Sequence, residues 1–286
     1  MSNCILLITN EGYEDMTKVC LYSLLEHIDY TKVDILLYVD GPCSIYNEFK
    51  DKVKINHIDY KLPITLSVSS EMKKWDLDLI SHRISLLDEL KYNYDKILLL
   101  DTDTLVIDDF SELFELEKVS GYNCYDLHKS YTDTVGFKPI VNSKQPNFYL
   151  NCGVTLLPSK ILKKFNLMAE YLKDLYIRGA EYTCPEQDFF NYLFDDKFDF
   201  ENKYNYMLTN KGKFESKIIH YVSNTKPTKV DFVSMIMDYN IYLLYYNYIE
   251  KHRNNLSNDF CSVIKEKIKE VNDFINTNNI KSIMRV

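Results

Sequence analysis

Two aspartates, a histidine and a lysine have the types and surroundings from which a site for a metal-bound diphosphate could be built. Asp101 and Asp103 come directly after the apolar run 97–100, so a segment that is expected to be buried ends in two charges. Buried charges require partners. Far downstream, His220 and Lys226 follow a second short apolar stretch. Two carboxylates and an imidazole suit a divalent cation, with the imidazole favouring Mn²⁺ over Mg²⁺, and a lysine beside them suits a phosphate.

The spacing of the two aspartates permits both to bind one ion. In an extended segment, residues i and i+2 point to the same side, so Asp101 and Asp103 can converge. An Asp-x-Asp also occurs by chance in many solvated turns, and a lone histidine such as His220 is usually a hydrogen-bonded core residue. Only the combination indicates an enzyme that handles a metal-chelated diphosphate.

An alternation of strands and helices over the first hundred residues predicts how these groups are positioned. Strands separated by helices indicate βαβ units and a largely parallel, buried sheet. In such sheets ligands bind outside the carboxyl ends of the strands, and Asp101 and Asp103 follow such an end. The expected strands are residues 4–9, 33–39, 53–58 and 96–100, and the expected helices are residues 15–27 and 81–90.

The regular alternation is lost after residue 104. The further strands expected are 121–126, 147–157 and 217–222, and the further helices are 160–177, 186–194, 238–250 and 260–275. This order predicts an α/β catalytic domain over residues 1–227. It also predicts a helical C-terminal extension over residues 228–286, which packs on that domain or on a partner chain.

Composition narrows the class of protein. The 286 residues are 46% hydrophobic, which is enough for a sizeable core. A formal charge of −8 disfavours nonspecific nucleic-acid binding, which needs a basic face. The seven cysteines include no CxxC pair, so a reduced, cytoplasmic setting is expected. No run reaches the roughly 18–20 apolar residues of a membrane span, and the apolar N-terminus is typical of a first strand, not of a signal peptide.

At this point several short blocks, in order along residues 4–228, resemble the retaining glycosyltransferases of family 8. This family includes glycogenin, galactinol synthase and bacterial lipopolysaccharide sugar transferases. The resemblance implies a GT-A type, Rossmann-like mixed sheet flanked by helices. It also implies transfer of a hexose or pentose from a UDP-sugar to an acceptor hydroxyl, with retention of anomeric configuration and dependence on Mn²⁺, with Mg²⁺ possible.

The first blocks resemble the part of the family that binds the nucleotide. Leu7-Ile8-Thr9-Asn10 is similar to the uridine-binding strand and turn, and Tyr13 is placed to stack on uracil. Arg83 occupies the place of a basic residue that contacts the donor. Asp101-Thr102-Asp103 is similar to the Asp-x-Asp motif, whose acids bind Mn²⁺ and the donor ribose.

The later blocks resemble the sugar and phosphate parts of the family's site. Asn151-Cys152-Gly153-Val154 is similar to the block that lines the sugar site, and Glu186-Gln187-Asp188, followed by Asn191, to the block beside the anomeric carbon. In the last block His220 would complete the metal site and Lys226 would bind the diphosphate.

Three residues depart from the family pattern. Ser223 stands where glycine is usual, Thr228 where tryptophan is usual, and Glu186 where aspartate is common. The first two could reshape the phosphate loop, and the third bears on how the sugar is positioned.

The resulting assignment has three parts. The metal ligands are Asp101, Asp103 and His220. The catalytic candidates are Glu186, Gln187, Asp188 and Lys226. The donor-binding candidates are Leu7, Thr9, Asn10, Tyr13, Arg83, Asp101, Thr102, Asp126, Asn151, Gly153 and Lys226, where Asp126 is included because it ends the expected strand 121–126, although an ordinary turn aspartate fits that position as well.

Other functions remain open at this stage. A haloacid-dehalogenase-like phosphatase also carries an Asp-x-Asp after a strand, but Leu105 replaces its Thr or Val and the motif lies late in the chain. A non-catalytic UDP-sugar-binding protein and a sugar-nucleotide pyrophosphorylase are further alternatives. The tyrosines at 239, 242, 245, 246 and 248 could be self-glycosylation acceptors but are more simply explained by helix packing. The donor sugar, a glycan, lipid-linked or protein acceptor, a front-face or double-displacement mechanism, and homodimerisation are not decided by the motifs.

Overall fold

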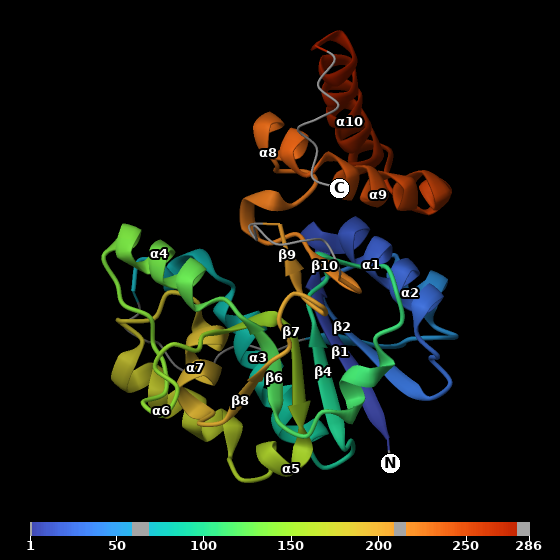
Figure 1. The fold of residues 1–286 in the computed structure, drawn as a ribbon. Coiled ribbons are helices and arrows are strands. Elements are labelled where there is room, and N and C mark those ends of the chain that lie inside the picture. Colours follow the sequence, from blue (N-terminus) through green and yellow to red (C-terminus); the bar gives the residue numbers. More distant parts are fainter. Residues whose placement is uncertain (1, 59–68, 209–215, 279–286) are drawn as a thin grey trace.

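The computed structural model describes residues 2–58, 69–208 and 216–278. Within these ranges the chain forms two sheets and the helices that cover them (Figure 1). The larger sheet lies between two helical layers, and the smaller sheet lies between it and the C-terminal helices. Residues 279–286 of the expected extension fall outside the described ranges.

The larger sheet is mixed. Its first four strands are parallel, whereas β7 runs antiparallel to both of its neighbours, and β6 and β8 are again parallel. The expected strands of the first hundred residues are therefore confirmed, with the antiparallel β7 added beside β4. In spatial order the strands are β3 (Lys54–Ile58), β2 (Val33–Asp40), β1 (Asn3–Asn10), β4 (Lys96–Leu100), β7 (Leu150–Pro158), β6 (Val119–Asn123) and β8 (Lys197–Asp199).

Both faces of this sheet are apolar because helices cover both. Successive residues of β1 point to opposite sides, so Ile5 and Leu7 pack into one core cluster and Leu6 and Ile8 into another. The first cluster lies under α1 (Glu14–His27) and α2 (Ile45–Phe49). The second lies under α3 (Leu77–Leu90), α6 (Leu167–Arg178) and α7 (Pro185–Leu193). The expected helix 15–27 is confirmed, and the helix expected at 81–90 begins four residues earlier, at Leu77.

The smaller sheet joins segments that are distant in the sequence. It consists of β5 (Thr104–Val106), β10 (Ile218–His220) and β9 (Tyr206–Met207). β10 is antiparallel to β5, and His220 pairs with Thr104 in this register. The pairing places His220 directly beside the end of the Asp101–Asp103 segment.

The C-terminal helices pack on the rest of the chain through a third hydrophobic cluster. They are α8 (Phe232–Met237), α9 (Tyr239–Lys251) and α10 (Asn258–Asn278). The cluster also includes Val19 of α1, Leu105 of β5 and Ile219 of β10. Tyr242 and Tyr245 are each 1% exposed within it, so their aromatic character serves helix packing.

Two sequence predictions are wrong in detail. The strand expected at 121–126 ends at Asn123, and Asp126 lies instead in the first turn of α4 (Tyr125–Val135), which also takes up the first part of the unassigned stretch 129–146. The helix expected at 160–177 is two helices, α5 (Ser159–Leu162) and α6. They are separate because the Asn166 side chain accepts a hydrogen bond from the Ala169 amide at 3.1 Å and so begins a new helix.

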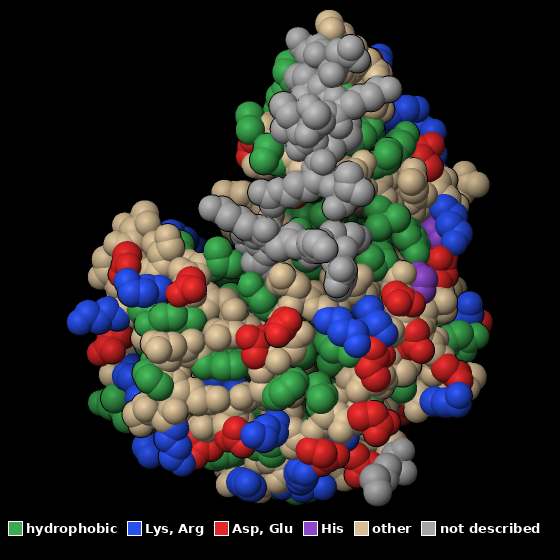
Figure 2. Space-filling model, viewed as in Figure 1, with side chains coloured by type: hydrophobic (Ala, Val, Ile, Leu, Met, Phe, Trp, Pro, Cys, Tyr) green, Lys and Arg blue, Asp and Glu red, His purple; other side chains and the backbone are tan. Residues whose placement is uncertain are grey.

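Short 3₁₀ segments complete the chain between these elements. They are η1 (Glu11–Tyr13), η2 (Met72–Lys74), η3 (Ser111–Glu115), η4 (Ser223–Thr225) and η5 (Arg253–Asn255). Among the described helices, none combines the length and the apolar character that crossing a bilayer requires. On the face shown in Figure 2, basic and acidic side chains are interspersed.

Candidate active site

The first two metal-ligand candidates lie in a tight turn between two strands. β4 ends at Leu100 and β5 begins at Thr104, and the Thr104 hydroxyl donates a hydrogen bond to the Asp101 carbonyl at 2.7 Å. The extended geometry expected for Asp101 and Asp103 is therefore wrong. Their carboxylates are brought together by the turn, not by the alternation of a strand.

His220 reaches the same point from the opposite strand. Its Nε2 atom lies 3.2 Å from Asp103 Oδ1 and 3.7 Å from Asp101 Oδ2. One ligand atom from each of these three residues lies within 4.8 Å of the others. The structure thus places Asp101, Asp103 and His220 close enough to share one cation.

A chain of amides sets the orientation of the imidazole. Asn205 Nδ2 donates to Asn151 Oδ1 at 2.8 Å, so the Asn205 oxygen faces His220 Nδ1 at 3.1 Å as an acceptor. The Nδ1 proton is therefore used, and Nε2 is turned toward the carboxylates. Asn205 was not predicted from the sequence, because a single polar residue within the stretch 204–208 carries no motif.

The electrostatics around Asp103 suit a cation. Its Oδ2 atom pairs with the ammonium of Lys226, while its buried Oδ1 atom faces His220 Nε2 at 3.2 Å and has no other partner among the described residues. Burial alone would raise the pKa of the Asp103 carboxyl, but His220 and Lys226 outweigh it and hold the pKa well below its usual range. An ionised, incompletely partnered carboxylate beside a second carboxylate and an imidazole fits a divalent cation.

Lys226 connects the carboxylates to the expected nucleotide platform. Its Nζ atom lies 5.4 Å from the centre of the Tyr13 ring, which sits half-buried at the end of η1. Burial would lower the pKa of Lys226, but Asp103 raises it, so the lysine stays charged. The Lys226 ammonium, the Tyr13 ring and the Asp103 carboxylate therefore lie close to one another.

The remaining candidates for binding the nucleotide differ in how exposed they are to solvent. Leu7 is fully buried within β1 and packs into the first core cluster. Thr9 is 2% exposed, and its hydroxyl hydrogen-bonds with the Thr17 hydroxyl at 2.7 Å. Asn10 is half-buried at the carboxyl end of β1. Thr102 is buried within the turn. The structure thus places Asn10, of this group, nearest to solvent.

Arg83 links the metal-ligand cluster to the second acidic block. Its two terminal nitrogens each donate at 2.8 Å, one to Asp101 Oδ1 and the other to Glu186 Oε2. The other carboxylate oxygen of Glu186 is buried without a hydrogen-bond partner among the described residues. Burial raises the pKa of Glu186 to about 7, although Arg83 opposes the shift.

The Asn151–Gly153 segment of β7 lies between the two blocks. Asn151 Nδ2 donates to Gln187 Oε1 at 3.1 Å, and the Cys152 amide donates to the same oxygen at 3.0 Å. Gly153 passes directly against the imidazole, because a Cβ atom built on it would lie 1.9 Å from His220 Cε1. This position requires glycine for the histidine to hold its place.

Asp188 and Asn191 are turned into the protein. Asp188 accepts hydrogen bonds from the Thr183 and Cys184 amides at 2.7 and 2.8 Å and from the Tyr149 hydroxyl at 2.7 Å. Asn191 bonds to both the N–H and the C=O of Leu150. Both side chains thus fix α7 against β7.

The remaining candidates lie at the edge of this arrangement. Asp126 is exposed in α4, and no contact among the described residues joins it to the cluster. Ser223, which replaces the usual glycine, has φ of +50°, a conformation that favours glycine. The departure from the family pattern therefore leaves a strained backbone at the start of the phosphate loop. Thr228 is half-buried beyond it.

Comparison with known proteins identifies the family. The sequence model of glycosyl transferase family 8 matches residues 4–229. A comparison with curated protein sequences yields no match.

Solved structures resemble the chain at low sequence identity. The galactosyltransferase LgtC with donor and acceptor sugar analogs has 15% identity and a TM-score of 0.58, over 80% of this chain and 90% of LgtC. The bifunctional glycosyltransferase WbbM has 17% identity and a TM-score of 0.62, over 93% of this chain and 51% of WbbM. Mouse xyloside xylosyltransferase 1 has 16% identity and a TM-score of 0.54, over 79% of this chain and 99% of that protein.

These neighbours are glycosyltransferases of the GT-A fold, so the fold prediction is confirmed. The matched region includes every block on which the resemblance rested and ends just before α8. The phosphatase and pyrophosphorylase alternatives are set aside by this match. The chain belongs to glycosyl transferase family 8.

Proposed function

We propose that this protein transfers a hexose or pentose from a UDP-sugar to an acceptor hydroxyl, with retention of anomeric configuration and dependence on Mn²⁺ or Mg²⁺. The observation that carries the proposal is the convergence of Asp101, Asp103 and His220 beside Lys226. A second acidic block is joined to this cluster through Arg83.

The cluster suits the departure of UDP. A divalent cation held by Asp101, Asp103 and His220 would neutralise charge that develops on the β-phosphate. Lys226 supplies a further positive charge from the protein, already positioned by Asp103. Asn205 supports the arrangement because it holds the imidazole in one orientation.

Nucleotide binding would fix the donor relative to the acceptor. Tyr13 offers an aromatic face for uracil, and Asn10 offers an amide beside it at the end of β1. Arg83 reaches from the cluster toward Glu186 and would contact the sugar end of the donor. Positioning of this kind lowers the entropic part of the barrier.

The second acidic block bears on the mechanism of retention. Gln187 is a poor nucleophile, and both Asp188 oxygens are already bound by protein donors. A front-face route is therefore favoured at these two positions, and Glu186 is the carboxylate to test for a covalent intermediate. In this proposal Asp188 acts by holding α7 in place.

The wider setting is part of the same proposal. We infer a catalytic domain over residues 1–227, an extension over 228–286, and a reduced cytoplasmic location in keeping with seven free cysteines. A homodimer remains a prediction. Self-glycosylation at the α9 tyrosines is disfavoured, because Tyr242 and Tyr245 are buried. The acceptor could be a glycan, a lipid-linked sugar or a protein.

The direct test is a panel of UDP-sugars with Mn²⁺, assayed for UDP release without added acceptor. The panel should include UDP-galactose and UDP-xylose, because two structural neighbours are named as a galactosyltransferase and a xylosyltransferase. Slow hydrolysis of one donor is expected to exceed that of the others and to stop with EDTA. Binding of UDP without release from any donor would instead support a non-catalytic UDP-sugar-binding protein.

A further inference from the structure

The C-terminal helices contact both chain segments that would bind the donor nucleotide. We propose that these helices, α8 to α10, act as a positioning element for the donor site, with Tyr242 of α9 as the residue that holds the phosphate loop. The inference rests on the proposed function. It adds a role for a part of the chain that lies outside the family match at residues 4–229.

The first contact is with the loop that carries Lys226. The Tyr242 hydroxyl donates to the Thr225 carbonyl at 2.8 Å, directly before the lysine. In the reverse direction, the Tyr221 hydroxyl donates to the Ile241 carbonyl at 3.2 Å. Hydrogen bonds of two buried tyrosines thus join α9 to Tyr221, shortly before the η4 segment, and to Thr225 at its end, and η4 itself contains the strained Ser223.

The second contact is with the segment that follows Tyr13. Lys18 of α1 is buried, and its ammonium donates to the Asn255 carbonyl at 3.1 Å and to the Ser44 hydroxyl at 2.8 Å. The same ammonium pairs with Glu14 at 2.9 Å. The first turn of α1 is therefore tied to the loop before α10.

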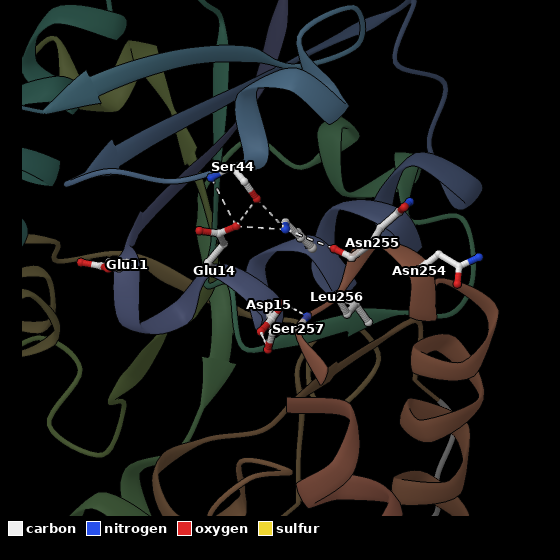
Figure 3. Close-up of a pocket in the computed structure, with 9 residues that line it drawn as sticks. Glu11, Glu14, Asp15, Ser44, Asn254, Asn255, Leu256 and Ser257 are labelled. Atoms are coloured by element: carbon white, nitrogen blue, oxygen red, sulfur yellow. Dashed lines mark hydrogen bonds and ion pairs between the residues drawn. The ribbon is translucent and has the colours of Figure 1, made fainter. Parts of the chain in front are cut away.

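A second hydrogen bond strengthens this seam, the contact between the start of α1 and the loop before α10. The Ser257 amide donates to Asp15 Oδ1 at 3.0 Å. Within the start of α1, the Thr17 hydroxyl donates to the Tyr13 carbonyl at 2.8 Å and so joins Tyr13 to this helix. The polar groups that line the cavity of about 450 Å³ here largely bond to one another across the seam (Figure 3). We therefore interpret the cavity as part of an internal interface and not as a separate ligand site.

Apolar packing makes the two contacts act together. Val19 of α1, Leu105 of β5 and Ile219 of β10 share one buried cluster with α9 and α10. Leu105 and Ile219 are close neighbours in sequence of Asp103 and His220. Because packed interiors deform little, a shift of α9 would move the Tyr13 turn and the Lys226 loop relative to each other.

The test compares two tyrosines of the same helix. Tyr242→Phe removes only the hydroxyl that holds the Thr225 carbonyl, whereas Tyr239→Phe removes a hydroxyl that bonds to Asn272 inside the extension at 2.6 Å. Each loses one hydrogen bond, so similar losses of thermal stability are expected. UDP affinity with Mn²⁺ is measured by calorimetry, and the turnover of the preferred donor is measured at saturation.

Tyr242→Phe is expected to weaken UDP binding by about three- to tenfold with turnover at saturation within about twofold of wild type. Tyr239→Phe should leave both within about twofold. Amide hydrogen exchange over residues 221–228 should quicken in Tyr242→Phe alone, which keeps the test informative if the assay is weak. Equal UDP affinities and equal exchange in the two variants would overturn the inference. If wild type binds no UDP with Mn²⁺, the proposed function fails as well.

Discussion

Two acidic motifs of this chain, Asp101-Thr102-Asp103 and Glu186-Gln187-Asp188, look alike in the sequence but differ in the structure. Asp103 pairs with Lys226 through one oxygen, and its second, buried oxygen faces His220 Nε2 at 3.2 Å with no other partner among the described residues. Asp188 is more deeply buried, at 1% exposed against 8% for Asp103, and its oxygens accept from two backbone amides and the Tyr149 hydroxyl. The first carboxylate retains a lone pair for a ligand, and the second is fully used by the protein.

The pKa values of the two carboxyls also differ, as their hydrogen-bond and ion-pair partners do. Burial raises the pKa of Asp188 to about 6, because its hydrogen bonds offset only part of the cost. For Asp103, His220 and Lys226 more than offset burial and keep the carboxyl ionised. The difference teaches that the partners of a buried carboxylate, more than its motif, separate a ligand-binding role from a structural one.

The largest expected effect comes from removing one of the three side chains that would bind the metal. His220→Ala should reduce turnover by roughly 10²-fold or more, if loss of a metal ligand costs on the order of 3 kcal/mol. Initial rates at limiting Mn²⁺ check the prediction. His57→Ala, at an exposed position of β3, is the matched control and should keep wild-type rates. Wild-type activity in His220→Ala would exclude the assigned ligand.

The next prediction concerns Asp188, the carboxylate that is bound by the protein itself. Asp188→Asn should lower the free energy of unfolding by about 2 kcal/mol, because the two backbone N–H groups lose a charged acceptor and the new amide nitrogen faces the Tyr149 hydroxyl in place of an accepting oxygen. Urea unfolding gives the stability, and Mn²⁺ titration should show unchanged affinity. Asp103→Asn should lose Mn²⁺ affinity as well as stability, because it also removes the buried partner of Lys226. Loss of Mn²⁺ binding in both variants would remove the distinction.

A smaller effect is expected from crowding the imidazole. Gly153→Ala places a methyl group where the His220 ring lies, so the ring must move. Mn²⁺ affinity should fall by about tenfold or more, as it does when the support of a ligand is disturbed. Gly12→Ala meets its nearest atom at an ordinary 3.5 Å and should leave Mn²⁺ affinity unchanged. Equal affinities in the two variants would contradict the described contact.

The pH dependence of turnover tests the ion pair of Arg83 with Glu186, through which the two acidic motifs are joined. The pKa of Glu186 is raised to about 7, so the carboxyl gains a proton as the pH falls through 7 and its ion pair with Arg83 is lost. At pH 6 turnover should then be about tenfold below its plateau, if the ionised form is required. Rates between pH 5.5 and 8.5 check this, and Glu186→Gln should lack the acid limb. An unchanged limb in that variant would assign it to another group.

The smallest expected effect is at the strained loop. Ser223→Gly should stabilise the protein by about 0.5 kcal/mol, because relief of the positive φ slightly exceeds the entropy that glycine gains in the unfolded chain. Ser262→Gly, at an exposed position inside α10, should instead destabilise it by about 0.5 kcal/mol. Thermal unfolding of both variants measures the difference, and destabilisation by Ser223→Gly would contradict the strain.

Sequence reasoning identified the residues of the cluster but not the geometry that brings them together. The ordered blocks placed Asp101, Asp103 and His220 in one site, and the apolar runs gave the strands that carry them. The turn at residues 101–103 was not predicted, because an Asp-x-Asp motif after an apolar run is compatible both with a continuing strand and with a turn. Asn205 was missed because its role exists only through partners from β7 and β10.

The second motif shows a further limit. Nothing in the spacing of Glu186-Gln187-Asp188 reveals that Asp188 faces inward, since that follows from the direction of α7 and its contact with Tyr149. Asp126 was assigned to a strand end because the apolar run before it resembles a strand, but β6 stops at Asn123 and the chain turns into α4. Tertiary contacts, which the local pattern does not contain, decided both cases.

The most direct measurement is anomalous diffraction at the manganese edge from crystals grown with Mn²⁺ and UDP. The account predicts one peak bounded by Asp101, Asp103 and His220, with the diphosphate on the side of Lys226 and uracil on Tyr13. A bound UDP with no peak between these three side chains, or with the peak at another site, would contradict it.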